Sequence, residues 1–277
     1  MVSQPVLEVM FDDLKVSIFK SNQEMGLMAA HLASEAIAQA IVEKGVANVI
    51  LAAANSQLTF LEGLTAATDI DWSKVNFFHM DEYIGLEAGH SASFSQFLRR
   101  KFLDYIHPKA FFTIPCDRKD LDVICKDYEQ LLHSYPADVC AMGIGENGHV
   151  AFNDPPYADF DDPVWVKTVQ IDDISRQQQV NEGHFPNIDR VPRTAFTLTI
   201  PALLAAKKIL VIVPEARKAD AVYRSLFGPI VPSCPASILR KVAHARLLLD
   251  QDSAAKSFQN LETKKNKGTN NKPEIVP

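Results

Sequence analysis

The sequence has few cysteines and none of the spacings in which cysteine binds a metal or builds a disulfide framework. Its four cysteines, Cys116, Cys125, Cys140 and Cys234, lie far apart, with no C-x-x-C pair and no paired Cys/His spacing. This excludes a zinc ribbon and a small disulfide-rich fold. We expect buried free thiols and no metal site.

Long apolar runs and an export signal are also missing. The longest apolar runs, Val46–Ala54 and Ile209–Val213, stop well short of the roughly 20 residues that a membrane span needs. The N-terminal segment has no early positive cluster and no continuous apolar core, which excludes a secretory signal. We therefore expect a cytoplasmic protein with no membrane partner.

The chain carries no excess of basic residues. Its 28 Lys and Arg face 34 Asp and Glu, and the formal net charge of -6 disfavours a large nucleic-acid-binding face. An anionic ligand must therefore be held by local charge. A hydrophobic content of 47% excludes global disorder, and 277 residues leave room for one large α/β domain or two modest ones.

Helix and strand patterns alternate along the chain. Ser21 and Glu24 form a capping box that predicts a helix over 21–44, closed by Gly45, and Val46–Ala54 predicts a strand buried on both faces. Further helices are expected over 57–67, 92–106, 117–134 (capped by Asp117) and 215–227, and strands over 75–80, 110–114, 138–144, 165–171, 208–213 and 246–249. This alternation predicts a doubly wound α/β fold, with a mostly parallel sheet and helices on both faces.

Two segments depart from this alternation. Residues 153–192 are turn-rich and polar, and we expect them to form an excursion over the functional site. From Glu262 onward the chain is polar and poor in apolar residues. We therefore expect one α/β domain over 1–261 and a disordered tail over 262–277.

Ligands of open α/β sheets bind beyond the carboxyl ends of the strands, so polar residues directly after predicted strands are site candidates. Asp81 and Glu82 follow the second strand; one can be a general base tuned by partial burial, or both can be loop acids in water. Ser56 follows the first strand at a helix start, where a hydroxyl binds an anion or simply caps the helix.

The glycine-rich segment after the strand predicted over 138–144 is more specific. Gly145 and Gly148 bring backbone N–H groups close to a ligand and present His149 from a tight turn. Its imidazole can move protons at neutral pH, with either Asn147 or Asp154 fixing the tautomer. A surface histidine in a turn is the alternative.

Cations and amides complete the candidate set. Arg217 and Lys218, in the first turn of a predicted helix, oppose its dipole unless they face an anion, and a solvated pair is the alternative. Arg176 and the run Gln177–Gln179 carry many donors, which suits either a lid over a hydroxylated ligand or a solvated loop.

Four stretches in the same order, HMDEYIGL, HSASF, GIGENGHVAFNDP and VPRTAFTLTIPALLAAKKILVIVPEARKA, resemble the glucosamine-6-phosphate deaminase (isomerase) family, whose superfamily also holds 6-phosphogluconolactonase. The likeness runs from about Val46 to Asp250. It implies a Rossmann-like sheet and a cofactor-free conversion of an amino-sugar 6-phosphate to a ketose 6-phosphate plus ammonia.

By position, the resemblance makes Asp81 the base that moves a proton between C2 and C1, and His149 the ring-opening acid and base. Asn147 stands where the family usually has Asp, and Asp154 where it usually has Glu. An Asn holds the imidazole by a hydrogen bond but supplies no charge to it. Lys218 matches a phosphate-binding lysine of the family.

The phosphate loop departs most from the family pattern. Ala54-Asn55-Ser56-Gln57 replaces a Gly-Ser-Thr turn, so only the serine matches, as in a diverged branch. Around Arg176 the match to the family's remaining phosphate-binding arginine is not unique. The substrate is expected to be a small sugar phosphate, but the sequence does not decide its epimer or whether the chain forms a homo-oligomer.

Three functions stay open at this point. The first is the deaminase. The second is a 6-phosphogluconolactonase-type hydrolase, in which His149 acts and Asp81 is dispensable. The third is a non-catalytic sugar-phosphate sensor, which would normally carry a fused helix-turn-helix and a basic surface.

Overall fold

A computed structural model of the protein describes residues 3–87 and 89–257. Its main sheet has eight strands: β1 (Leu7–Phe11), β2 (Leu14–Phe19), β3 (Ala47–Leu51), β4 (Val75–His79), β6 (Ala110–Phe112), β7 (Val139–Met142), β10 (Lys208–Val213) and β11 (Ala245–Asp250). They lie in the order β1-β2-β11-β10-β7-β3-β4-β6, and every neighbouring pair is parallel except the β1–β2 hairpin. The predicted mostly parallel sheet is confirmed. The expected tail over 262–277 lies outside the described residues.

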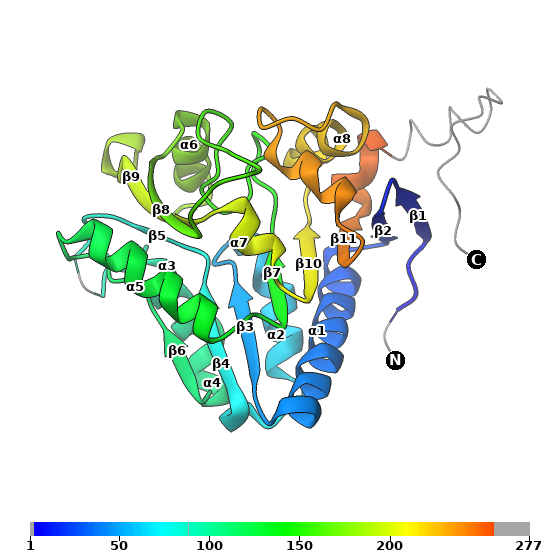
Figure 1. The fold of residues 1–277 in the computed structure, drawn as a ribbon. Coiled ribbons are helices and arrows are strands. Elements are labelled where there is room, and N and C mark those ends of the chain that lie inside the picture. The colour runs from blue at the N-terminus through cyan, green and yellow to red at the C-terminus, as the bar shows by residue number, and fades with distance from the viewer. Residues whose placement is uncertain (1–2, 88, 258–277) are drawn as a thin grey trace.

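Helices cover both faces of this sheet (Figure 1). Along β10, Leu210 and Ile212 pack into the core shared with α1 (Asn22–Lys44) and α2 (Leu58–Thr65), whereas Ile209 and Val211 face the opposite core. That second core contains α5 (Leu121–Ser134), α7 (Ile200–Leu204) and α8 (Ala219–Phe227). Three further helices are α3 (Phe94–Leu98), α4 (Asp104–Ile106) and α6 (Asp173–Asn181).

The first predicted helix forms as expected. The Ser21 side chain accepts from the Glu24 backbone N–H, and Gly45 ends α1 in the left-handed conformation at φ 77°. α1 is long and apolar enough to cross a membrane by length and composition alone, but half of its most apolar window is buried inside the protein. It packs against α2 and the sheet as a core helix.

Other element boundaries differ from the predictions. The α5 helix begins at Leu121, so Asp117 does not cap it, and Asp120 precedes it without a side-chain cap. The helix expected over 92–106 is interrupted by a π-helical stretch, Arg99–Leu103, between α3 and α4. Short 3-10 turns, Asn55–Gln57 and Ala216–Lys218, precede α2 and α8.

A second, three-stranded antiparallel sheet lies beside the main one, in the order β5 (Asp81–Tyr83), β9 (Thr194–Leu198) and β8 (Val166–Gln170). The strand predicted over 165–171 therefore exists but belongs to this sheet. Its mixed pattern of buried and exposed residues suits an antiparallel strand with one wet face. β5 and β9 escaped prediction, as did α6 inside the polar excursion.

The arrangement of these layers decides where a ligand can bind. In Figure 1 the arrows of β3 and β10 point toward the end of the molecule where α6 and α8 lie. The segment over 153–192 contributes α6 to that end, as expected of an excursion over the site. The loops that follow the central strands therefore meet beneath α6.

Candidate active site

A cavity of about 510 Å³, including its open mouth, lies at the carboxyl ends of the central strands. Ser56 follows β3, Asp81 follows β4, Gly145 and His149 follow β7, and Lys218 follows β10; all five line the cavity. The predicted convergence of an acid, an imidazole and a cation on one sheet edge is therefore observed. The walls between them are formed by Ala52, Ala53, Ala54, Met80, Phe94, Gly143, Ile144, Ala151, Phe152, Gln178 and Gln179.

Asp81 stands where the chain leaves the main sheet for the small one. β4 ends at His79, and Asp81 then pairs with Thr197 of β9, so its backbone belongs to the small sheet. Burial, followed by the nearby charge of Glu82, raises the pKa of Asp81 well above its usual range. A carboxyl group of this kind exchanges protons closer to neutral pH than an ordinary aspartate does.

Glu82, predicted to bind substrate, does not line the cavity. Successive residues of a strand point to opposite faces, and Glu82 faces the start of α3. Its carboxylate accepts hydrogen bonds from the backbone N–H groups of Tyr83, Phe94 and Ser95 at 3.0–3.1 Å and from the Ser93 hydroxyl at 2.7 Å. This side chain holds α3 in place, and its predicted contact with substrate stays a prediction.

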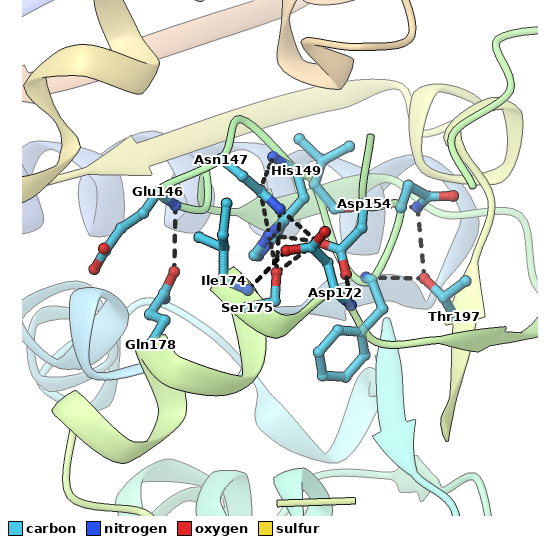
Figure 2. A network of polar contacts seen from close by, with 12 residues as sticks. Glu146, Asn147, His149, Asp154, Asp172, Ile174, Ser175, Gln178 and Thr197 are labelled. Carbon is cyan, nitrogen blue, oxygen red and sulfur yellow. Dashed lines mark hydrogen bonds and ion pairs between the residues drawn. The ribbon is translucent and has the colours of Figure 1, made fainter. Parts of the chain in front are cut away.

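The His149 ring packs against backbone that only glycine can provide. A Cβ added to Gly145 would lie 2.1 Å from the ring. On the other side, Nδ1 contacts the Asn147 amide oxygen at 2.8 Å, the Ser175 hydroxyl at 2.8 Å and the Asp154 carboxylate at 3.0 Å (Figure 2). Among the described residues no partner binds Nε2, which leaves this nitrogen free for a ligand.

Asp154 anchors this arrangement. It also accepts from the Asn147 side chain at 2.9 Å, the Ser175 hydroxyl at 2.5 Å and the Asp172 backbone at 2.8 Å. Burial opposes its ionisation, but the charge and hydrogen bond of His149 and the other donors lower the pKa of Asp154 to about 2. The carboxylate thus supplies the charge that Asn147 lacks, and the two predicted alternatives for holding the ring act together.

Ser56 and Lys218 are the candidates for binding an anion. The Ser56 hydroxyl accepts from the Gln57 side chain at 3.2 Å, so its own proton is free to point into the cavity. Lys218 is 3% exposed, and no hydrogen bond or ion pair joins its ammonium group to another residue in the described ranges. Burial, with help from neighbouring Arg217, lowers the pKa of Lys218 to about 8.

Three further predicted residues lie outside the cavity. Arg217 binds Glu182 at 2.8 Å, Glu146 at 3.1 Å and Glu215 at 2.5 Å. Burial opposes its charge, but Glu215 and Glu182 raise the pKa of Arg217. Arg176 donates hydrogen bonds to Asp173 and to the carbonyls of Ile188 and Val191. These bonds connect α6 to the later part of the same excursion. Gly148 packs next to Cys234. All three have neighbours within the protein, and their predicted contact with substrate stays a prediction.

Sequence reasoning missed Ser175 and singled out the Gln177–Gln179 run without choosing among its members. Ser175 lies in α6, and the sequence there has no apolar periodicity that would predict a helix. Gln178 and Gln179 bring the same helix to the cavity wall. Within the described part of the chain, no cluster of three or more His, Cys, Asp or Glu side chains is arranged to hold a metal ion.

Comparison with known proteins gives the same match in sequence and in structure. Residues 20–248 match the model of a family described as glucosamine-6-phosphate isomerases/6-phosphogluconolactonase. The chain is 30% identical to a glucosamine-6-phosphate deaminase of Streptococcus thermophilus over 88% of this chain and 100% of the relative. A deaminase of Lactobacillus delbrueckii subsp. bulgaricus is 29% identical over 87% of this chain and 99% of the relative.

Two solved structures illustrate the range of the fold. A monomeric glucosamine-6-phosphate deaminase superimposes with a TM-score of 0.79 at 28% identity, over 87% of this chain and 99% of that one. A 6-phosphogluconolactonase from Shewanella baltica superimposes with a TM-score of 0.69 at 17% identity, over 87% and 98% of the two chains. At that lower identity the second likeness shows the fold alone.

Proposed function

Since this chain belongs to the family of glucosamine-6-phosphate isomerases and 6-phosphogluconolactonases, we propose that it is a deaminase that converts glucosamine 6-phosphate to a ketose 6-phosphate and ammonia. The observation that carries the proposal is the pairing of two separate proton-transfer groups around one cavity. His149 is held by Asp154, and Asp81 is buried with a raised pKa. Lactone hydrolysis needs only the first of these groups.

Ring opening is the task of His149. The cyclic sugar must lose a proton from O1 and gain one at O5, and one imidazole near both oxygens can do both. Asp154 and Asn147 contact Nδ1, so Nε2 faces the substrate and exchanges the proton. The Asp154 carboxylate also stabilises the imidazolium that forms between the two transfers.

Isomerisation is the task of Asp81. Once the sugar ring is open, the Asp81 carboxylate removes the proton from C2, which gives an enolamine, and returns a proton to C1. The product is a C2 imine, which water hydrolyses to the ketone with release of ammonia. Because burial raises the pKa of Asp81, the proton it carries between the two carbons is bound more firmly than an ordinary aspartate would bind it.

We assign the phosphate to Ser56 and Lys218. A phosphate dianion accepts a hydrogen bond from the Ser56 hydroxyl and gives the buried Lys218 ammonium the partner that the protein does not provide. Binding energy from this remote group holds C1 and C2 against Asp81, so both residues affect kcat as well as KM.

The test is ammonia release from glucosamine 6-phosphate by the wild type and Asp81→Asn, with 6-phosphogluconolactone hydrolysis assayed beside it. We expect Asp81→Asn to lower kcat by about 10²- to 10⁴-fold while substrate still binds. Asp161→Asn, at an exposed position, is the matched control. Full turnover by Asp81→Asn, or lactone hydrolysis without ammonia release, would contradict the deaminase.

We further propose that the enzyme works in the cytoplasm, because all four cysteines are free in the structure. The solved relative is described as monomeric. Light scattering on the purified chain distinguishes that state from the homo-oligomer left open by the sequence.

A further inference from the structure

The helix α6 points one of its faces into the cavity. Ser175 and Gln179 are four residues apart, so they lie one above the other on the same side of the helix. Ser175 contacts the His149 ring, and Gln179 lines the cavity wall. Besides the serine that holds the histidine, the excursion therefore contributes the side chain of Gln179 to the cavity wall, next to Gln178.

Gln179 differs from the two glutamines before it. Gln178 accepts from the Glu146 backbone at 3.2 Å and donates to Glu182 at 2.8 Å, and Gln177 donates to Asn181 at 2.9 Å. The side-chain amide of Gln179 has no hydrogen bond to any residue in the described ranges, and its Oε1 is buried. A buried acceptor without a partner is unfavourable, which points to a donor supplied by a ligand.

The position of Gln179 indicates which part of a ligand it meets. Four residues of helix rise about 6 Å, so Gln179 lies that far from Ser175 along α6. In the same direction lies Glu182, whose carbonyl accepts from Asn55, the neighbour of Ser56. Gln179 therefore lies between the His149 end of the cavity and the end that holds Ser56.

We propose that Gln179 is a specificity-determining residue that accepts a hydrogen bond from a hydroxyl group in the middle of the substrate's carbon chain. The inference rests on the proposed sugar-phosphate substrate and adds a contact to it. A phosphate dianion offers only acceptors and does not satisfy Oε1, whereas a sugar hydroxyl donates. Bonds from Ser175, Gln178 and Glu182 hold α6 in place, so the amide is positioned before the ligand arrives.

Two probes separate the hydroxyl contact from the phosphate contact. Glucitol 6-phosphate, an open-chain polyol phosphate, carries both groups, and inorganic phosphate carries one. Calorimetric dissociation constants are measured for the wild type, Gln179→Met and the matched control Gln177→Met, whose side chain is exposed on the same helix. We expect Gln179→Met to bind glucitol 6-phosphate about 10-fold or more weakly and inorganic phosphate within about twofold of wild type, with Gln177→Met unchanged for both.

Three results overturn the inference: equal weakening of both probes, which assigns Gln179 to the phosphate; unchanged binding of both; or a wild type that binds glucitol 6-phosphate no more tightly than inorganic phosphate. Ammonia release is measured on the same preparations. A wild type that binds the polyol phosphate but releases no ammonia refutes the deaminase, while the comparison at Gln179 still stands.

Discussion

Raising the pH through the pKa of Lys218 is the most direct test of how the site holds an anion. In the ligand-free protein this pKa is lowered from 10.5 to about 8, because the ammonium group is buried and lies beside Arg217. An ordinary surface lysine keeps its charge beyond pH 9. Lys218 should instead lose its charge, and with it the attraction for phosphate, in the range where enzymes are routinely assayed.

The size of the effect follows from the fraction of Lys218 that is charged. With a pKa of about 8, about 90% is protonated at pH 7 and about 10% at pH 9. The phosphate monoester is a dianion throughout this range, since its second pKa is about 6. Affinity for a phosphorylated ligand should therefore fall about tenfold between pH 7 and pH 9.

Glucitol 6-phosphate is the ligand for this assay, because it lacks the amine of the substrate, which titrates in the same range. Its Ki against ammonia release is measured from pH 6.5 to 9.5 for the wild type and Lys218→Arg. The arginine keeps its charge, so the alkaline rise in Ki should disappear in that variant. A Ki that is flat to pH 9.5 in the wild type, or an equal rise in Lys218→Arg, refutes the assignment of Lys218 to the phosphate.

Three substitutions test the remaining parts of the site. Gly145→Ala puts a Cβ 2.1 Å from the His149 ring and should lower kcat by about 100-fold. Gly143→Ala is the control, because the nearest contact of its added Cβ is 3.3 Å. It should lower kcat by less than about tenfold. Lys218→Met should raise the free energy of unfolding at pH 7 by about 3 kcal/mol. The pKa of Lys218 is lowered in the folded protein, so burying the charged lysine carries a penalty that is full below pH 8 and gone above 10.5. Urea unfolding that shows lower stability in the variant contradicts this. Asp154→Asn should lower the free energy of unfolding at pH 7 by about 2 kcal/mol. The gap to wild type should close as the pH falls from about 4 through about 2, because the wild-type carboxylate takes up its proton in that range. A gap that stays near its pH 7 size at pH 2 contradicts this.

Much of the cavity could be predicted because the sheet is parallel. Ser56, Asp81, His149 and Lys218 each follow an apolar strand, and the carboxyl ends of parallel strands meet at one edge. The sequence predicts both the strands and the positions where they end, since strands buried on two faces are continuously apolar. The position of these four residues needed no knowledge of side-chain contacts.

Local pattern does not show which of two neighbouring residues points into the cavity. Glu82 adjoins Asp81, but the chain is extended there, so the two carboxylates face opposite sides. Arg217 adjoins Lys218, yet three carboxylates from distant segments bind it. Arg176 lies in a segment whose sequence predicts a loop, because α6 has no apolar stripe. Such choices depend on partners brought by the tertiary fold, which local pattern does not reveal.

The residues of the cavity follow β3, β4, β7 and β10, four adjacent strands in the middle of the main sheet. Along the chain they extend from Ser56 to Lys218, so the cavity closes only when several long crossovers are complete. No sub-fragment of the sheet contains the full set. During refolding, activity should therefore return with the slowest phase that orders the sheet, and the site should be among the last features to form.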